Sequence, residues 1–286
     1  MHISSLELPA PAKINHFLHI CGRRDDGYHN LQTVFQFLEI ADRLYFEHRD
    51  DGNIQLQTPF DEIPNEENLI VRAARALQEF SGSQHGANIR INKVLPMGAG
   101  LGGGSSNAAT CLVALNHLWQ LGLSTEQLQQ IGITLGADVP IFIYGKSAWA
   151  EGIGEKLQAI ELAERWYLLI IPTCHVSTAK IFSHPQLTRD TEMRTIAAFL
   201  EQGSQDHFQN DCENLVRKLY PEVDLAFNTL SRFTEARMTG TGACVYASFA
   251  DKQQALQAAD KLPADMQYII SKSSNLSPLY EALQIL

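Results

Sequence analysis

The sequence predicts an α+β fold of two tightly packed domains, residues 1–160 and 161–286. The chain has 286 residues, about twice the roughly 150 residues of an average domain. Apolar residues make up 45% and charged residues 19%, an ordinary globular composition that excludes a disordered, collagen-like or coiled-coil chain. Strand and helix patterns both occur, and their order changes after about residue 160, which places the expected boundary there.

The first half carries mostly strand patterns. Side chains that alternate between two faces predict a strand over residues 12–20. Similar segments predict strands over 33–40, 44–47, 54–57, 87–94, 140–144 and 148–151. An apolar face predicts a helix over 68–80, and a second helix follows residue 104 with the stripe Ala108, Leu112, Leu115 and Trp119. Ser124 and Gln127 form a capping box that begins a third helix.

The second half predicts more helix. A buried strand is expected over 167–171 and two further strands over 244–249 and 268–271. Helices are expected near 178–184, 191–202, 211–230 and 252–261. No long linker, repeat or low-complexity tract separates these segments, so we expect the two domains to pack closely.

Charge and cysteine usage exclude several classes of function. The net charge of −10 argues against binding duplex nucleic acid, which needs a basic surface. The N-terminus lacks the features of a secretory signal, and the apolar runs are far shorter than the roughly 20 residues that span a membrane. The five cysteines form no CxxC pair. We therefore expect a cytoplasmic monomer or weak homodimer that binds neither nucleic acid nor membrane.

The most informative segment is a glycine-rich loop between a predicted strand and a predicted helix. Five of the seven residues from Gly98 to Gly104 are glycine, which is costly unless the backbone must bend sharply or approach a ligand. Backbone N–H groups and the positive end of the helix dipole would meet at this loop, which predicts an anion site, most commonly for phosphate. Ser105 and Ser106 are expected to cap the helix and also to offer hydroxyls to phosphate oxygens or to a metal. The candidate residues are Pro96, Met97, Gly98, Ala99, Gly100, Leu101, Gly102, Gly103, Gly104, Ser105 and Ser106.

The sequence of this loop allows three interpretations. A flexible turn does not account for the strand, glycines and helix together. The spacing Gly98-x-Gly100-x-x-Gly103 matches a dinucleotide-binding fingerprint, but the acidic residue expected about 20 positions later, at the end of a second strand, is absent. A nucleoside triphosphate site fits better, although no lysine follows the last glycine as it would in a Walker A loop.

Three ordered motifs resemble those of the GHMP small-molecule kinases. They are Pro11-Ala12-Lys13-Ile14-Asn15, the glycine-rich loop of residues 96–106, and Met238-Thr239-Gly240-Thr241-Gly242-Ala243-Cys244. Together they cover most of the chain. The resemblance implies ATP as co-substrate, a ribosomal-S5-like N-terminal domain and a ferredoxin-like C-terminal domain.

Two further segments narrow the resemblance. Gly27-Tyr28-His29 and Gly136-Ala137-Asp138-Val139-Pro140 are similar to the branch of this family that acts on a cytidine diphosphate conjugate of a sugar alcohol. That resemblance implies transfer of the ATP γ-phosphate to a substrate hydroxyl, which yields a 2-phosphate and ADP in the non-mevalonate route to isoprenoid precursors. The alternatives are another GHMP kinase, acting on mevalonate, homoserine or a sugar, and an inactive nucleotide-binding relative.

The resemblance assigns catalysis to Lys13 and Asp138. Asp138 follows Gly136-Ala137 at a turn into the segment 140–144. Its position allows two interpretations: an oriented carboxylate in a pocket, or a residue that caps nearby N–H groups. Without the resemblance, the sequence around Lys13 predicts an ordinary strand lysine with an exposed ammonium. The resemblance makes Asp138 the general base and Lys13 a cation that stabilises charge on the attacking oxygen. Mg²⁺ should accompany ATP, and because residues 107–120 contain no acid we assign it no protein ligand beyond the Ser106 hydroxyl or water.

The resemblance also implies the substrate contacts. Tyr28 and His29 would recognise the cytosine, with Phe182 on the other side of the base and Thr178 nearby. Gly240, Thr241 and Gly242 would close the second domain onto the phosphates, and Asn15 completes the substrate-binding set.

Overall fold

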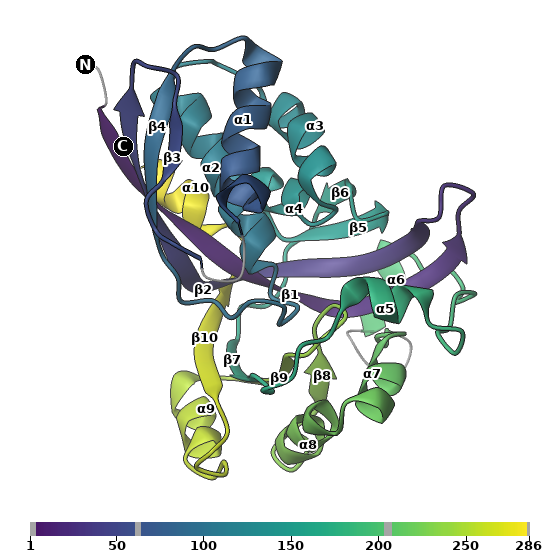
Figure 1. Cartoon of the computed structure of the whole chain (residues 1–286). Coiled ribbons are helices and arrows are strands. Elements are labelled where there is room, and N and C mark those ends of the chain that lie inside the picture. The colour runs from purple at the N-terminus through teal and green to yellow at the C-terminus, as the bar shows by residue number, and fades with distance from the viewer. Residues whose placement is uncertain (1–3, 61–63, 203–207, 285–286) are drawn as a thin grey trace.

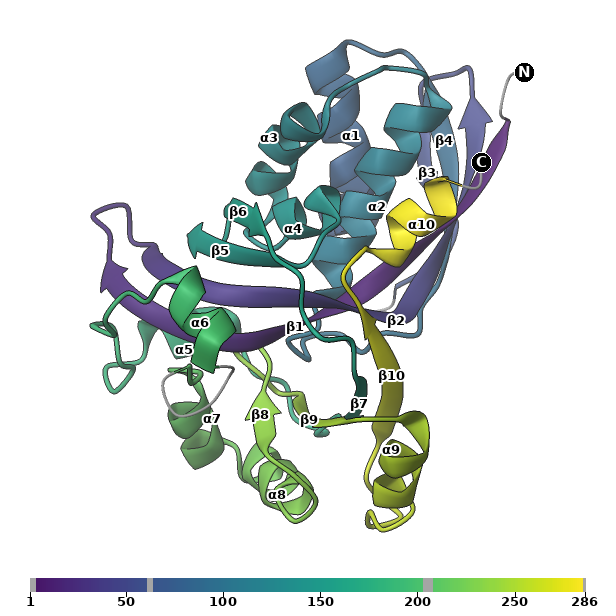
Figure 2. The ribbon, with the colours of Figure 1, turned by 180° about the vertical axis from the view of Figure 1, so that it is seen from behind.

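Two long antiparallel strands run through the whole molecule and join its two lobes (Figure 1). The computed structural model of the chain describes residues 4–60, 64–202 and 208–284. Strand β1 spans Ser5–Arg23 and strand β2 spans His29–Arg49, and they pair from Ser5 with Glu47 to Arg23 with His29. Helices and short strands lie on one side of these strands, and the second lobe lies on the other (Figures 1 and 2).

The first lobe packs helices against one face of the sheet that β1 and β2 begin. Its remaining elements are β3 (Ile54–Leu56), a 3₁₀ turn (Asn65–Glu67), α1 (Leu69–Ser81), β4 (Gly86–Asn92), α2 (Gly103–Leu118), α3 (Thr125–Leu135), α4 (Val139–Tyr144), β5 (Ala148–Gly152) and β6 (Lys156–Ala159). The core lies between the sheet and helices α1, α2 and α4. Phe37, Phe46, Leu77 and Phe142 are among its largest fully buried side chains.

The second lobe is a four-stranded antiparallel sheet covered by helices. Its elements are β7 (Trp166–Ile170), α5 (Thr178–Ser183), α6 (Ile196–Gln202), α7 (Glu213–Leu219), α8 (Pro221–Leu230), β8 (Ala236–Met238), β9 (Val245–Phe249), α9 (Lys252–Ala259) and β10 (Tyr268–Ser274). The spatial order is β10-β7-β9-β8, with helices between β7 and β8 and between β9 and β10. This is the βαββαβ arrangement of a ferredoxin-like domain.

The chain returns to the first lobe at its C-terminus. Ser273 and Ser274 of β10 pair with Leu38 and Phe37 of β2. The last helix, α10 (Pro278–Leu283), lies beside α2 and β1, and Leu279 is fully buried in the first-lobe core (Figure 2). The domain boundary near residue 160 stays a prediction.

The strand predicted over 140–144 is wrong, because this segment forms helix α4. Residues 139–143 are all buried, and a short run that is apolar on every side has no period that separates strand from helix. Two signals mark the helix. Pro140 stands in the first turn, and Gly145 ends the helix in the left-handed conformation at φ 71°.

Other predicted boundaries also change. The strands expected over 33–40 and 44–47 are one strand, β2, because pairing with β1 and β4 continues through residues 41–43. The helix expected over 211–230 is two helices, since Pro221 cannot continue α7 and instead begins α8. The helix expected over 191–202 begins only at Ile196, because Thr191 and Arg194 make polar contacts with Asp211 and Gln32. Strands β6 and β8, the 3₁₀ turn and helix α10 were not predicted.

Candidate active site

A cavity of about 550 Å³ lies where the two lobes meet. The glycine-rich loop and the start of α2 form one wall, and β1 and β2 form the floor. The turn before α4 and two segments of the second lobe, residues 175–182 and 240–242, complete it. Segments that are far apart in the sequence therefore surround a single space.

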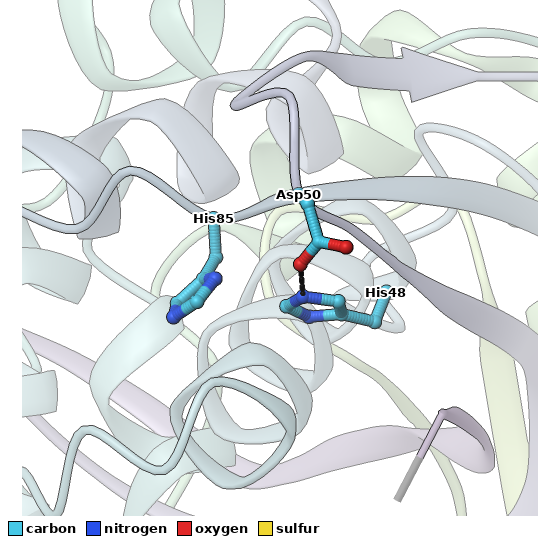
Figure 3. Close-up of side chains that lie close together, drawn as sticks. All are labelled: His48, Asp50 and His85. Atoms are coloured by element: carbon cyan, nitrogen blue, oxygen red, sulfur yellow. Dashed lines mark hydrogen bonds and ion pairs between the residues drawn. The ribbon is translucent and has the colours of Figure 1, made fainter. Parts of the chain in front are cut away.

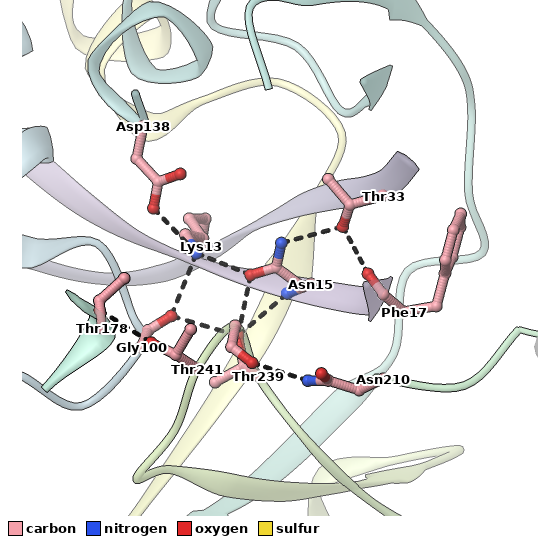
Figure 4. A network of polar contacts seen from close by, with 11 residues as sticks. Lys13, Asn15, Phe17, Thr33, Gly100, Asp138, Thr178, Asn210, Thr239 and Thr241 are labelled. Carbon is pink, nitrogen blue, oxygen red and sulfur yellow. Dashed lines mark hydrogen bonds and ion pairs between the residues drawn. The ribbon is translucent and has the colours of Figure 1, made fainter. Parts of the chain in front are cut away.

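Lys13 is a buried cation at the floor of this cavity. Its side chain is 3% exposed, in contrast to the exposed ammonium of an ordinary strand lysine. Nζ lies 2.7 Å from Asn15 Oδ1, 3.2 Å from the Gly100 carbonyl oxygen and 3.2 Å from Asp138 Oδ2 (Figure 4). An ammonium has three N–H donors, so three oxygens satisfy it without water. Burial is tolerated because each N–H has a partner.

Asp138 reaches Lys13 from the opposite wall. It stands at the first position before α4, but its carboxylate makes no capping hydrogen bond with the described N–H groups of that helix. Instead the carboxylate points toward Lys13 and is 38% exposed to the cavity and solvent (Figure 4). The capping interpretation of Asp138 is therefore wrong. One oxygen contacts the ammonium, and the group remains open to a ligand.

The glycine-rich loop approaches its neighbours too closely for larger residues. Gly100 has φ of 75°, and a Cβ there would lie 2.4 Å from the Thr239 carbonyl oxygen. Gly102 has φ of 73°, and a Cβ there would lie 2.7 Å from Cζ of Phe142. Glycine supplies both the left-handed conformation and the missing side chain. The loop thus passes directly over Lys13 and against the second lobe.

Helix α2 begins at Gly103 and directs its first turn into the cavity. Gly103, Gly104 and Ser105 line the space, and no side chain of the described residues caps these N–H groups. The expected capping role of Ser105 and Ser106 is therefore wrong, because Gly102 occupies the cap position. Ser106 is fully buried, and its hydroxyl has no hydrogen-bond partner within the described ranges. Of the two serines, Ser105 is the one that faces the cavity.

A buried carboxylate on β2 anchors both ends of the loop. Asp42 is completely buried and accepts hydrogen bonds from the N–H groups of Val94 and Leu95 at 2.7 and 2.8 Å. It also accepts from Lys93 Nζ at 2.7 Å and from Asn107 Nδ2 at 2.8 Å. These donors lie immediately before the loop and in α2 after it. The loop is therefore held at both ends by one side chain, Asp42, which no sequence motif marks.

The C-terminal glycine motif is bonded to the same network. The Thr239 hydroxyl accepts the Asn15 N–H at 3.0 Å and lies 3.2 Å from the Gly100 carbonyl oxygen (Figure 4). Asn210 donates from its amide to the carbonyl of Gly240 at 2.7 Å, which holds the turn. The Thr178 and Thr241 hydroxyls are 2.9 Å apart. These bonds join β1, the glycine-rich loop and the second lobe.

A second cavity of about 430 Å³ adjoins the first beyond Thr178. Tyr28, His29 and Phe182 line it, and Thr178 and Phe182 line both cavities. Tyr28 is 57% exposed, whereas His29 is buried. The rings of His29 and Phe182 lie 5.3 Å apart with 31° between their planes.

Arg189 fixes the orientation of His29. Its guanidinium donates to the carbonyls of Phe182, His184 and Leu187, and its Nε–H donates to His29 Nε2 at 3.1 Å. A guanidinium only donates, so Nε2 is the acceptor and the proton of the neutral ring is on Nδ1. Burial, then the charges of Arg189 and Arg23, lower the pKa of His29. At neutral pH the His29 ring is therefore neutral, and its one N–H donor is on Nδ1.

Most of the predicted site residues meet at these two cavities. The main cavity is lined by Lys13, Asn15, Pro96, Gly98, Ala99, Gly100, Gly102, Gly103, Gly104, Ser105, Asp138, Thr178, Phe182, Gly240, Thr241 and Gly242. Tyr28 and His29 line the second. Three loop residues lie elsewhere, because Met97 is exposed and Leu101 and Ser106 are buried. Prediction missed Asp42, Thr239 and Arg189, and of these only Thr239 lies inside a recognised motif.

Two family models match the chain. The model described as "GHMP kinases N terminal domain" matches residues 68–146, and the one described as "GHMP kinases C terminal" matches residues 189–267. The chain belongs to the GHMP kinase family, as its three motifs predict.

Relatives with high identity carry one name. The 4-diphosphocytidyl-2-C-methyl-D-erythritol kinase of Methylococcus capsulatus is 54% identical over 284 residues, which cover 99% of this chain and 96% of that protein. The enzyme of the same name from Pseudomonas aeruginosa is 52% identical over 281 residues and covers 98% of both chains.

Solved structures of this family have the same fold as the chain. A crystal structure of 4-(cytidine 5'-diphospho)-2C-methyl-D-erythritol kinase is 32% identical with a TM-score of 0.80, over 94% of this chain and 99% of that one. A mevalonate kinase is 15% identical with a TM-score of 0.69 over 94% and 99% of the two chains, a likeness of fold alone. The predicted two-domain α+β fold is confirmed.

Proposed function

We propose that the protein transfers the γ-phosphate of ATP to a hydroxyl of 4-diphosphocytidyl-2-C-methyl-D-erythritol, which yields the 2-phosphate of that compound and ADP. The reaction belongs to the non-mevalonate route to isoprenoid precursors. The observation that carries the proposal is the Lys13–Asp138 pair, with Nζ and Oδ2 3.2 Å apart, between the glycine-rich loop and the second cavity. The identity to enzymes of that name supports the choice of substrate.

The wall of the cavity formed by the glycine-rich loop and the start of α2 suits a triphosphate. The N–H groups at the start of α2 are uncapped within the described chain, and the positive end of a 16-residue helix points at the same place. An anion bound there would receive backbone hydrogen bonds without a Walker lysine. We assign residues 96–105 to this role, with Met97 and Leu101 contributing backbone only.

Asp138 and Lys13 act on the hydroxyl that attacks. As the new bond between the hydroxyl oxygen and the γ-phosphorus forms, the bond from that phosphorus to the β-phosphate oxygen breaks and ADP leaves. The O–H bond of the substrate breaks in the same process, and its proton passes to the Asp138 carboxylate. The Lys13 ammonium stabilises negative charge on the attacking oxygen. Asn15 and the Gly100 carbonyl hold the ammonium in place.

The donors in the cavity fit Mg²⁺ carried by the nucleotide. Oxygen ligands suit this ion, and the Ser105 hydroxyl, which faces the cavity, would hold it together with phosphate oxygens and water. When bound, Mg²⁺ neutralises charge on the β- and γ-phosphate oxygens. Ser106, the other candidate ligand, is too deeply buried for this role.

The second cavity suits a pyrimidine base. Tyr28 and Phe182 supply aromatic faces for stacking, and His29 presents an Nδ1–H donor because Arg189 occupies Nε2. A cytosine offers acceptors at its ring nitrogen and carbonyl oxygen that this donor can reach. Thr178 lines both cavities, so it lies at the passage from the base to the reacting end.

The proposal places the protein in the cytoplasm. All five cysteines are free thiols, as expected in a reducing cytoplasm. No helix among the described residues is long and apolar enough to cross a membrane.

A coupled assay of ADP release tests the function. The protein is incubated with ATP, Mg²⁺ and one alcohol at a time: 4-diphosphocytidyl-2-C-methyl-D-erythritol, mevalonate, homoserine and galactose. We expect ADP release only with the first. Release with another alcohol and not with the first would overturn the choice of substrate, and ATP binding without turnover on any alcohol would indicate an inactive relative.

A further inference from the structure

Three side chains of metal-binding type lie together away from the active site (Figure 3). His48 is near the end of β2, Asp50 is in the turn that follows, and His85 directly precedes β4. One ligand atom from each lies within 4.8 Å of the others. None of the three lines either cavity of the active site.

Hydrogen bonds hold the backbone of each histidine, that of His48 within β2 and that of His85 in the loop just before β4. The His48 N–H donates to the Ser4 carbonyl at 2.9 Å, and His48 pairs across the sheet with Ala87 of β4. The His85 N–H donates to Ser83 Oγ at 3.2 Å, and its carbonyl accepts from Gln78 Nε2 at 2.8 Å. The ring centroids of His48 and His85 lie 4.8 Å apart. Neighbours that a bound ion would not disturb therefore hold the backbone of both histidines, while the exposed His85 side chain can still turn toward an ion.

The carboxylate completes the arrangement. Asp50 Oδ1 lies 2.9 Å from His48 Nε2, and Asp50 is exposed, so it can rotate toward an ion. Arg49, the neighbouring cation, pairs with Asp51 instead of Asp50. The Asp50 carboxylate is thus shared with no arginine in the described part of the chain.

We propose that His48, Asp50 and His85 bind a divalent first-row transition ion, with Zn²⁺ as the best-suited occupant. Imidazole nitrogen and carboxylate oxygen are ligands of this class of ion, whereas Mg²⁺ prefers oxygen alone. At bond lengths of about 2.0–2.1 Å a tetrahedral ion spaces its ligand atoms about 3.4 Å apart, which rotation of the exposed Asp50 and His85 side chains can reach. The ion replaces the hydrogen bond between His48 Nε2 and Asp50 Oδ1, and the ring proton moves through water from Nε2 to Nδ1, so the imidazole that binds the ion is neutral. Water fills the fourth position.

Binding of Zn²⁺ would clamp the end of β2 to the start of β4. Because an ion that binds only the folded chain shifts the unfolding equilibrium, it raises the melting temperature. Because the ligand form of imidazole is neutral, binding weakens as the pH falls. This site is independent of the kinase reaction, and its failure would leave the proposed function intact.

Calorimetric titration of the tag-free, full-length protein with Zn²⁺ alone tests the proposal. At slightly alkaline pH and without nucleotide, we expect one saturable site. His85→Gln replaces an exposed side chain, so the fold should survive, and we expect affinity to fall by roughly tenfold or more. His48→Gln should behave likewise. His117→Gln, at an exposed position on α2, is the matched control and should bind as the unaltered chain does.

The melting temperature provides a second measurement. Zn²⁺ should raise it in the unaltered protein and in His117→Gln but not in His85→Gln. Absence of saturable binding would overturn the proposal. So would equal affinity in His85→Gln and the unaltered protein, which would place the ion at other groups such as the partly exposed thiols of Cys21 and Cys174.

Discussion

Lys13 is charged in a place where an isolated charge would be unstable. Removing an ammonium from water costs several kcal/mol, which hydrogen bonds and an ion partner must offset. Here Asn15, Gly100 and Asp138 supply one oxygen each. Such a cation serves stability poorly, because apolar residues would pack as well at less cost. Its position beside the partly exposed Asp138 carboxylate is what the proposed phosphoryl transfer requires.

The Lys13–Asp138 pair leads to the first prediction. Lys13→Met and Asp138→Asn should each lower kcat by roughly 10²–10⁴-fold, because the proton acceptor or its neighbouring charge is lost. KM for ATP should change little, since in the proposed mode of binding the phosphates contact backbone N–H groups rather than these two side chains. Steady-state kinetics with both substrates measures this. Lys272→Met and Glu164→Gln, which break a comparable surface pair, are controls and should leave kcat unchanged. Near-normal turnover in either active-site variant would contradict the mechanism.

The contact between Arg189 and His29 leads to the second prediction. Because the pKa of His29 is lowered, the ring is neutral at neutral pH and becomes protonated only as the pH falls through that lowered value. Protonation places a proton on Nε2, which opposes Arg189, so KM for the cytidylyl substrate should rise in acid. Arg189→Gln removes one cause of the lowered pKa, and the rise in KM should then begin at a higher pH.

The pH profile of KM, measured separately for each substrate, checks this prediction. KM for ATP should follow the same curve in Arg189→Gln and in the unaltered protein. Arg194→Gln, on the same segment but paired with Glu192, is the control. An unchanged pH profile for the cytidylyl substrate in Arg189→Gln would refute the positioning role of Arg189.

At the scale of elements, the glycine-rich loop is shaped by its neighbours as much as by its own residues. The Ala99 carbonyl accepts from the Cys244 N–H, and the Leu101 carbonyl accepts from the Lys13 N–H. The loop is therefore bonded to the second lobe on one side and to β1 on the other. Its conformation positions Lys13 and the start of α2 together.

Gly100 and Gly82 form a matched pair for the third prediction. Both have positive φ, 75° and 69°, but a Cβ at Gly82 would meet nothing within 4 Å whereas one at Gly100 would meet Thr239. Gly82→Ala should lose about 1–2 kcal/mol of stability from backbone strain alone and keep normal kinetics. Gly100→Ala should lose more and also raise KM for ATP. Urea denaturation and steady-state kinetics measure both, and equal losses in the two variants would contradict the close approach at Gly100.

Asp42 leads to the fourth prediction. Asp42→Asn keeps the shape but turns an acceptor of four hydrogen bonds into a group that also donates, and it leaves Lys93 without its counter-ion. Breaking a buried pair costs about 3–5 kcal/mol, so the free energy of unfolding should fall by that amount. KM for ATP should rise because the loop loses its anchor. Asp51→Asn, in an exposed pair, should cost far less, and a similar loss in both would refute the anchoring role.

At the scale of the molecule, the active site depends on the contact between lobes. Strands β1 and β2 both contact the two cores. Leu8 of β1 and Phe37 of β2 pack in the first core, and Ile20 of β1 and Leu31 of β2 pack with the second. β10 pairs with β2, and α10 returns to the first lobe. The chain thus ties the lobes together at both ends of its length.

Leu279 on α10 leads to the fifth prediction. Its side chain is fully buried in the first-lobe core, so Leu279→Ala should lower the free energy of unfolding by about 2–5 kcal/mol. At temperatures where the variant is folded, kcat should be unchanged, because α10 does not line either cavity. Urea denaturation checks the first statement and kinetics the second. Leu225→Ala, at an exposed position on α8, is the control and should change stability little.

The sequence was informative where local pattern and local physics agree. The helix over residues 69–81 has an apolar face and an Asn68 cap, and the α3 capping box of Ser124 and Gln127 is present as predicted. The glycine-rich loop was predicted because its composition would be costly in any ordinary turn. The prediction of a strand over residues 140–144 was wrong, because a segment that is buried on all sides shows no alternation of apolar and polar residues from which strand or helix could be predicted.

The sequence alone determined the presence of a glycine-rich loop at the start of a helix, the two-domain α+β class and the family motifs, and the comparisons confirm the class and the family. Only the tertiary structure decided that Lys13 is buried and lies 3.2 Å from Asp138, that Asp42 anchors the loop and that Arg189 orients His29. The physical reason is range. Backbone preferences and helix caps act over a few residues, whereas an ion pair between residues 13 and 138 exists only after the chain has brought distant segments together.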